Sequence, residues 1–200
     1  MKNKVLLAAA IGMLASAPAF AGEGQKYVAL DVGQSKYSDA CVGVPAGFSC
    51  KDTATAFRVA GGYGLSKNFG AEISYTDYGK SKASGTVGAV AVTGDTGSTA
   101  FQLVGTGALP LGEQFSLTGK IGIAFVSTTA TATAVFGPFS AAASISKNNT
   151  NGVWGVGAEY AFTPTISARL NYENLGTVGD AATTGTAKLS ATTIGVVFKF

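Results

Sequence analysis

The sequence contains no histidine and only two cysteines. Without an imidazole, Ser-His-Asp and Cys-His nucleophilic catalysis are both excluded, and an ordinary zinc site lacks its usual ligands. A mechanism based on paired carboxylates is left, with Glu72 and Glu159 as its candidates. Both carboxylates have cations on the same face of the predicted strands, so we expect ion pairs there. We therefore expect no enzymatic activity, no cofactor and no metal.

Charged residues are scarce, at 12% of the chain. Of the 14 Lys and Arg side chains, two (Lys2 and Lys4) precede the first apolar run, which leaves 12 basic against 11 acidic side chains. A nucleic-acid partner would require a strong basic excess, so we expect none. After residue 21 no apolar run approaches the ~20 residues that a helical membrane span needs.

The N-terminal segment has the three parts of a secretory signal peptide. Lys2 and Lys4 are basic, residues 5–15 are apolar, and Ala19-Phe20-Ala21 is a small-x-small cleavage site. The alternative, a membrane-spanning helix, is disfavoured because the apolar run is shorter than ~20 residues. We expect residues 1–21 to be removed and residues 22–200 to form one domain.

The C-terminal stretch alternates with a period of two, which is typical of a β-strand. Ile194, Val196, Phe198 and Phe200 share one face, and the chain ends on an aromatic residue. Aromatic residues at strand ends are typical of the interface between a membrane and water. The same alternation predicts eight strands, over residues 26–35, 55–65, 69–79, 99–109, 115–128, 152–162, 165–174 and 190–200.

The predicted connections alternate between short turns and longer segments. Short turns follow the second, fourth and sixth strands, and the longer segments cover residues 36–54, 80–98, 129–151 and 176–187. This alternation predicts an all-β fold, an eight-stranded antiparallel up-and-down transmembrane β-barrel preceded by a signal peptide. The barrel would lie in the outer membrane of a bacterial cell. Its long loops would face the outside of the cell, and both termini would lie in the periplasm.

The third long segment still alternates over residues 130–135, which predicts a strand that continues above the membrane. Its tip would be Phe136-Gly137-Pro138-Phe139. The two phenylalanines either form a contact site or pack on neighbouring loops.

The two faces of each predicted strand differ in charge. The larger apolar residues lie on one face and nearly all charges on the other. A soluble barrel with this pattern would have to bury the charges and expose the apolar face to water, which is unfavourable. In lipid the same pattern is satisfied, because a closed barrel pairs every backbone group. We predict a salt-bridge network in the lumen from Arg58, Glu72, Lys120, Glu159, Arg169 and Glu173, with Asp31 on the same face.

The expected contacts within this network follow from the turn at Thr163-Pro164. Glu159 and Arg169 are at nearly equal distance from that turn and should be cross-strand neighbours. Lys120 should reach Glu159, and Glu72 should face the cluster from across the barrel. The network should block the bore.

Four stretches resemble the OmpA-like transmembrane β-barrel domain, in the wider family of small outer-membrane β-barrels and opacity-type surface proteins. They are residues 57–64 (FRVAGGYG), 69–75 (FGAEISY), 117–122 (LTGKIG) and 168–173 (ARLNYE). The resemblance implies a lumen closed by salt bridges, with Glu72, Lys120, Glu159 and Arg169 at the matching positions. It also implies that Phe198 and Phe200 are read by the barrel-assembly machinery. Two-domain members continue into a peptidoglycan-binding domain, whereas this sequence ends at its eighth predicted strand, so we do not expect anchoring to the cell wall.

Cys41 and Cys50 both lie in the first long segment. In an exported protein they are expected to form a disulfide. The alternatives are two free thiols or a pair of metal ligands.

Three functions are compatible with this architecture. The first is a non-enzymatic barrel that supports the envelope or contacts a surface ligand or host through its loops. The second is a narrow porin-like channel for ions or small solutes, since eight strands leave a bore just filled by side chains and inward glycines leave room for water. A membrane enzyme is the least favoured. Besides any loop ligand, the expected partners are outer-membrane lipid and the assembly machinery.

Overall fold

A computed structural model describes residues 23–200 of the chain. The predicted signal peptide, residues 1–21, lies outside the described residues. Nine strands are present: β1 (Lys26–Ser38), β2 (Ser49–Lys51), β3 (Thr53–Gly64), β4 (Phe69–Val87), β5 (Val90–Pro110), β6 (Phe115–Phe136), β7 (Phe139–Ala161), β8 (Ile166–Asp180) and β9 (Gly185–Lys199).

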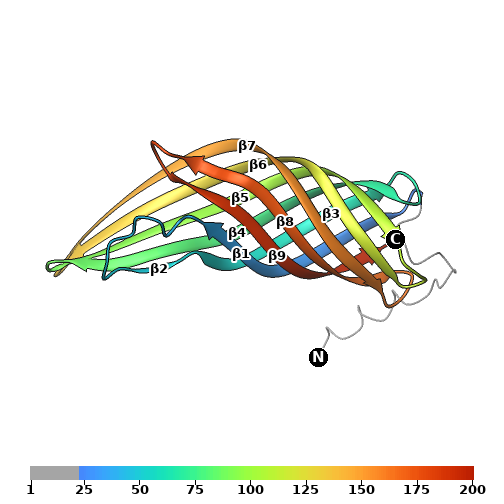
Figure 1. Ribbon diagram of the computed structural model, residues 1–200, viewed down its shortest axis with the longest axis horizontal. Helices are drawn as coiled ribbons and strands as arrows, with labels where there is room; N and C mark the ends of the chain where they lie inside the picture. The colour runs from blue at the N-terminus through green and yellow to red at the C-terminus, as the bar shows by residue number, and fades with distance from the viewer. Residues whose placement is uncertain (1–22) are drawn as a thin grey trace, which may run out of the picture.

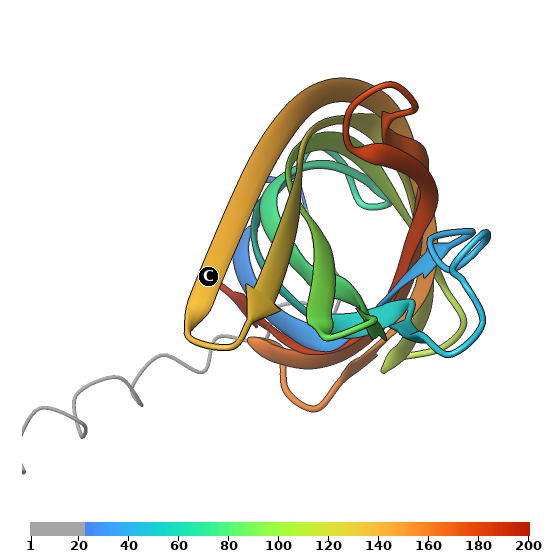
Figure 2. The same ribbon diagram turned by 90° about the vertical axis from the view of Figure 1, so that its left-hand side faces the viewer.

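Eight of these strands form a closed antiparallel ring (Figures 1 and 2). Each strand pairs with its neighbours in chain order, and β9 returns to pair with β1, so every strand of the ring has a partner on both sides. The ninth strand, β2, is a three-residue strand that pairs with the upper part of β4. The prediction of an eight-stranded up-and-down barrel is confirmed, with β2 as an addition.

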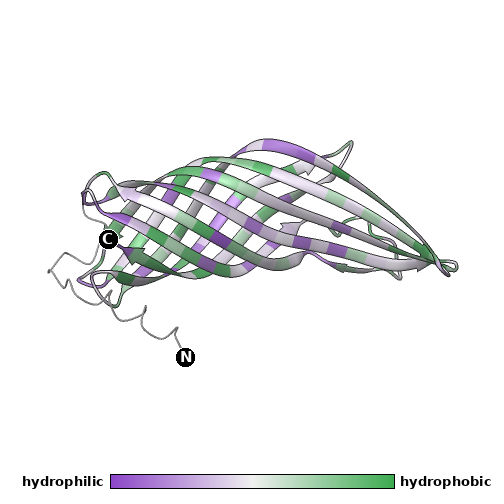
Figure 3. Cartoon of the chain, turned by 180° about the vertical axis from the view of Figure 1, so that it is seen from behind, coloured by the Kyte–Doolittle hydropathy of each residue, from purple (hydrophilic) through white to green (hydrophobic). Residues whose placement is uncertain are grey.

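The outer face of the ring is apolar. Val59, Leu103 and Ile121 are exposed by 53%, 52% and 73%, and they alternate with buried inward residues as the period of two predicted. Figure 3 shows the apolar residues concentrated around the half of the barrel that carries the C-terminus. Such a band is unfavourable in water and suits the hydrocarbon layer of a membrane. Within residues 23–200 we find no helix of the length and apolar character that crossing a bilayer requires.

Three of the four predicted long loops are largely strand instead. β4 and β5 continue to Val87 and Val90, β6 and β7 to Phe136 and Phe139, and β8 and β9 to Asp180 and Gly185. The prediction of loops over residues 80–98, 129–151 and 176–187 was therefore wrong for most of their length, apart from the strand expected over residues 130–135. Beyond the lipid both faces of a strand meet water, so the alternation of apolar and polar residues that marked the other strands is weak there.

A break in register between Asp77 and Lys80 divides β4. Gly79 adopts a φ of 66°, and a Cβ there would approach the carbonyl of Thr55, so this position favours glycine. The break shifts the alternation by one residue. As a result Tyr78 and Ser81 both point inward, while Lys80 points outward.

Cys41 and Cys50 are joined by a disulfide with a Cα–Cα distance of 5.8 Å. The bridge closes the segment between β1 and β2, and Cys50 itself lies in β2 opposite Ala83. Phe48 lies against Gly85 of β4. The disulfide therefore ties the irregular segment between β1 and β2 to the edge of β4.

We expect replacement of both cysteines by serine to loosen residues 39–51 without disturbing the barrel. The two cysteines have a sequence separation of 9. For a ring of this size, the loss of chain entropy in the unfolded state stabilises the folded state by at most about 2.7 kcal/mol. Proteolysis of the intact protein should become faster in this segment only. The shift in gel mobility on boiling, which reports the folded barrel, should be unchanged. Loss of that shift would show that the barrel itself depends on the bridge.

Candidate functional site

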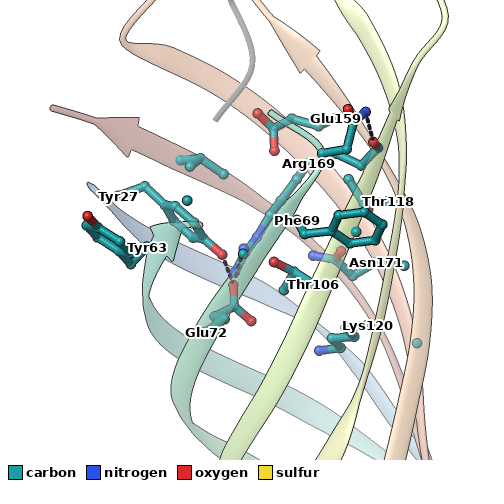
Figure 4. A pocket seen from close by; sticks show the side chains of 18 of the residues that line it. Tyr27, Tyr63, Phe69, Glu72, Thr106, Thr118, Lys120, Glu159, Arg169 and Asn171 are labelled. Atoms are coloured by element: carbon teal, nitrogen blue, oxygen red, sulfur yellow. Dashed lines mark hydrogen bonds and ion pairs between the residues drawn. The ribbon is translucent and has the colours of Figure 1, made fainter. Parts of the chain in front are cut away.

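The lumen holds a cluster of four buried charges, which we call the four-ion cluster: Asp31, Arg58, Glu72 and Arg169. The Arg169 Nε donates to Asp31 Oδ1 at 2.6 Å, and its Nη1 donates to Glu72 Oε2 at 3.0 Å. Arg58 also contacts both carboxylates, lying 3.4 Å from Asp31. Tyr27 adds a hydrogen bond to Glu72 at 2.9 Å, drawn in Figure 4. Two cations thus balance two anions, as burial in a low-dielectric interior requires.

A second group lies next to it and is built around Glu173. Lys120 forms an ion pair with this carboxylate, and the Tyr78 hydroxyl donates to it. The Gln102 amide nitrogen donates to the Tyr78 hydroxyl at 2.7 Å. All four side chains come from different strands, β4, β5, β6 and β8, so the group links strands across the bore.

Glycines on intervening strands make these contacts possible. Gly195 of β9 is the register partner of both Asp31 on β1 and Arg169 on β8, and Gly155 of β7 stands in the same way between Lys120 and Glu173. A Cβ at Gly155 would lie 2.8 Å from the Lys120 Cε. The Arg169–Asp31 and Lys120–Glu173 ion pairs therefore each join strands that are two positions apart, by passing over a residue that has no side chain.

This geometry corrects two expected contacts. Glu159 and Arg169 are register partners, as the turn predicted, but Arg169 reaches over Gly195 to β1 and β4 instead. Glu159 pairs with Lys199 at 2.5 Å, outside the four-ion cluster. Lys120 likewise contacts Glu173 and not Glu159. Register alone favours Glu159 as the partner of Arg169, but the inward glycines leave gaps through which the long side chains of Arg169 and Lys120 reach more distant strands.

Several lumen residues were missed as participants. Tyr27, Tyr78, Gln102 and Lys199 all carry the inward parity of their strands, so the period of two contained the signal. Asp31 had been placed on the correct face but left out of the expected network. The uncharged polar side chains among them supply the further hydrogen-bond partners that a buried carboxylate needs.

An apolar layer closes the lumen on the other side of these charges. We call it the apolar plug; its largest fully buried members are Tyr37, Tyr78, Val126, Val153, Leu175, Val178 and Leu189. Tyr37 is fixed in place because its hydroxyl donates to the Gly79 carbonyl at 2.9 Å and accepts the Ser98 N–H at 3.0 Å. The side chains that reach the bore from β1, β4, β6, β7, β8 and β9 thus pack against one another above the ions.

A cavity of about 80 Å³ remains on the side of the short turns. Tyr27, Glu72, Lys120, Glu159 and Arg169 line it, together with residues 67–69 of the first short turn (Figure 4). It has room for a few water molecules, and it ends at the two charged groups. Among residues 23–200 no three His, Cys, Asp or Glu side chains gather in a way that could hold a metal ion.

The closed ring, the apolar outer face and the ion-paired lumen define an integral β-barrel of the bacterial outer membrane. The chain belongs to the family of OmpA-like transmembrane domains, which it matches over residues 22–200. It is a non-catalytic membrane barrel of that family.

Solved structures show the same fold. Ail, the attachment invasion locus protein of Yersinia pestis, is 16% identical with a TM-score of 0.52, and the match covers 89% of this chain and 99% of Ail. The outer membrane protein OprG from Pseudomonas aeruginosa is 10% identical with a TM-score of 0.52, over 90% of this chain and 99% of OprG. No curated protein matches the sequence significantly.

Substitution of Gly195 by alanine tests the role of the intervening glycines. A Cβ there would collide with the Asp31 carboxylate and the Leu30 carbonyl, so the Arg169–Asp31 contact must open or β9 must move. We expect the free energy of unfolding to fall by about 1–3 kcal/mol, measured by urea titration in lipid vesicles. Gly61→Ala is the matched control, because its Cβ would lie 3.9 Å from the nearest atom, the Tyr27 carbonyl oxygen. Equal losses in both variants would contradict a specific role for Gly195.

Proposed function

We propose that this barrel is a non-conducting surface protein that contacts partners through its extracellular end, with both termini in the periplasm. The observation that carries the proposal is the contrast between the two parts of the molecule. Two successive layers of packed side chains, the charged groups and the apolar plug, cross the bore. The β4–β5 and β6–β7 hairpins meanwhile extend far beyond the lipid-facing band as one continuous sheet (Figure 1).

The tip of this sheet is apolar and exposed. Phe136 and Phe139 are 55% and 73% exposed, so they do not pack into neighbouring loops. Val87 at the tip of the β4–β5 hairpin is also exposed. Exposed apolar groups far from the lipid have a solvation cost, which supports a role in contact with other molecules.

Lysines gather on one outer side of the extracellular end. Lys51 of β2 lies directly opposite Lys82 of β4, and Lys80 is two residues away; all three are exposed. Like charges that face each other across antiparallel strands are unfavourable. Asp95 lies across from Lys82 on β5, but within residues 23–200 no ion pair joins them. Such a surface favours a polyanionic ligand. Ail of Yersinia pestis has been solved in complex with the heparin analogue sucrose octasulfate, at 15% identity, which makes heparin a suitable first probe.

We further propose that Phe198 and Phe200 form the signal read by the assembly machinery. Both rings are exposed on the lipid side of β9. The backbone of Phe200 exchanges two hydrogen bonds with Lys26, at 3.0 and 3.1 Å, so the last residue takes part in closing the ring.

The polyanion proposal predicts retention of the detergent-solubilised protein on immobilised heparin. Replacing Lys51, Lys80 and Lys82 by glutamine should lower the affinity at least tenfold, and added salt should weaken binding of the intact protein because exposed charges are screened. Lys67→Gln is the control, since Lys67 is exposed in a turn at the opposite end. Binding that is absent, or that falls equally in the control, would contradict the proposal.

The alternative function is a narrow channel, favoured only by the cavity on the periplasmic side. If both layers seal the bore, planar bilayers containing the intact protein should show no steady current. Lys120→Gln weakens the charged layer and Leu189→Ala the apolar plug, and each alone should leave the bore closed. The double variant should raise the opening frequency. Large steady currents through the intact protein would instead support the channel.

A further inference from the structure

One strand of the extracellular sheet has a bare edge. β7 pairs with β6 from Phe139 to Tyr160, but with β8 only from Trp154 onward. Residues 140–152 of β7 therefore have a strand partner on one side only. Figure 1 shows the β8–β9 hairpin ending well short of the β6–β7 tip, and Figure 2 shows the two hairpins on different sides of the rim.

The pairing with β6 identifies which backbone groups face outward from this edge. Phe139 faces Phe136 across a two-residue turn, and the Ala161 N–H donates to the Gln114 carbonyl, so odd-numbered residues of β7 bond to β6. In an antiparallel ladder the alternate residues point the other way. Their N–H and C=O groups point away from β6 at Ser140, Ala142, Ser144, Ser146, Asn148 and Thr150.

The base of the edge is closed by side chains. The Asn151 amide donates to the carbonyls of Leu175 and Thr177 at 2.8 and 2.6 Å, replacing the missing ladder to β8. The Lys147 Nζ lies 3.5 Å from the Asp180 Oδ2 and forms an ion pair with it. Asp180 accepts the Ala182 N–H at 3.0 Å, which lowers the pKa of its carboxyl and favours the charged form beside Lys147. These contacts hold β8 beside residues 147–151 of β7 and leave residues 140–146 of the edge uncovered.

The edge lacks the devices that normally prevent strand addition. Proteins protect edges with proline, a bulge or charge. Residues 139–146 contain no proline and no charge, and their register with β6 is unbroken. Lys147 is the one charged residue along the edge, and it is engaged with Asp180. The other end of the same sheet is different, since β2 covers part of β4 and carries Lys51.

We propose that this edge binds the same segment of a second copy of the protein in an opposing membrane, forming an antiparallel two-stranded junction. The inference rests on the contact function proposed above. The β7 segment of a second copy is uncharged, extended and already held as a strand by β6, so pairing costs little ordering entropy. Its small alanine and serine side chains form no pockets, and strand addition without pockets does not select foreign side chains.

Strand direction determines why the partner lies across a gap. In one membrane, two copies related by an axis along the membrane normal would present β7 in the same direction. Parallel strands bond with an offset of one residue, so identical segments cannot pair symmetrically. Opposing membranes present the two strands antiparallel. A two-fold axis at Ile145 then places the two isoleucines together and Lys147 opposite Ala143, which keeps the lysines apart.

The area of one strand edge is small compared with that of a stable interface. A single junction is therefore weak, and many junctions between two cells act together through avidity. The expected result is adhesion between cells without a stable dimer in dilute detergent.

The test uses two bacterial populations that express the protein and carry different fluorescent labels, with mixed doublets counted by flow cytometry. Ser144→Pro removes an edge N–H that is outside the β6 ladder, and Ser144→Lys adds a protective charge; each should lower mixed doublets at least fivefold when both populations carry it. Ser144→Ala keeps the N–H and should leave them unchanged. The shift in gel mobility on boiling confirms that each variant is folded. Doublets that persist in both Ser144→Pro and Ser144→Lys, or that form equally with cells lacking the protein, would overturn the proposal.

Ile145→Cys provides a direct readout of the partner. Under mild oxidation, adherent cells should yield a species of twice the monomer mass, while Leu103→Cys on the lipid-facing wall should not. A cross-link that forms equally in cells kept apart by dilution would place the pair in one membrane and overturn the opposing-membrane arrangement. The Lys51, Lys80 and Lys82 triple variant should adhere normally, so failure of heparin binding and failure of strand pairing are separate results.

Discussion

The structure depends on pairing buried charges inside a bore that is only a few side chains wide. An unpaired carboxylate or guanidinium in such an interior costs several kcal/mol, so the two arginines and two carboxylates of the four-ion cluster must meet. Arg58 on β3 joins its neighbours β1 and β4, whereas Arg169 on β8 reaches carboxylates on the same two strands, which are distant from β8 in the ring. The backbone hydrogen bonds close the barrel, and the charged side chains determine which strands contact one another across the bore.

Glycine is what allows these long contacts in so narrow a space. Gly195 and Gly155 lie between the partners of two ion pairs, and a side chain at either position would occupy the path of the contact. In a chain with 28 glycines, inward glycine suggests an open lumen when read alone. Here the space above each of these two glycines is filled by a charged side chain from a neighbouring strand, so the same residues contribute to closing the bore.

The period of two was sufficient to predict the fold and the inward face of every barrel strand. It placed Arg58, Glu72 and Arg169 in the lumen, because lipid on one side and packed side chains on the other impose a strong contrast on successive residues. It did not predict which charges pair. Register gives the neighbour of Arg169 as Glu159, but the choice of partner depends on the length of the arginine and on the gap at Gly195, which are three-dimensional properties. The strand extensions beyond the lipid were not predicted for a different reason, since water on both faces removes the contrast between successive residues.

The same change of solvent explains why a bare strand edge can exist in this molecule at all. In hydrocarbon an unpaired N–H or C=O has no substitute partner, so the ring must be closed where lipid surrounds it. Above the lipid, water can solvate the outward groups of Ser140, Ser144 and Ser146, and pairing becomes optional. β7 crosses this boundary: it is bonded on both sides from Trp154 downward and on one side above it. Where the second ladder ends, the constraint imposed by lipid ends, and the backbone groups beyond that point are available for contacts outside the barrel.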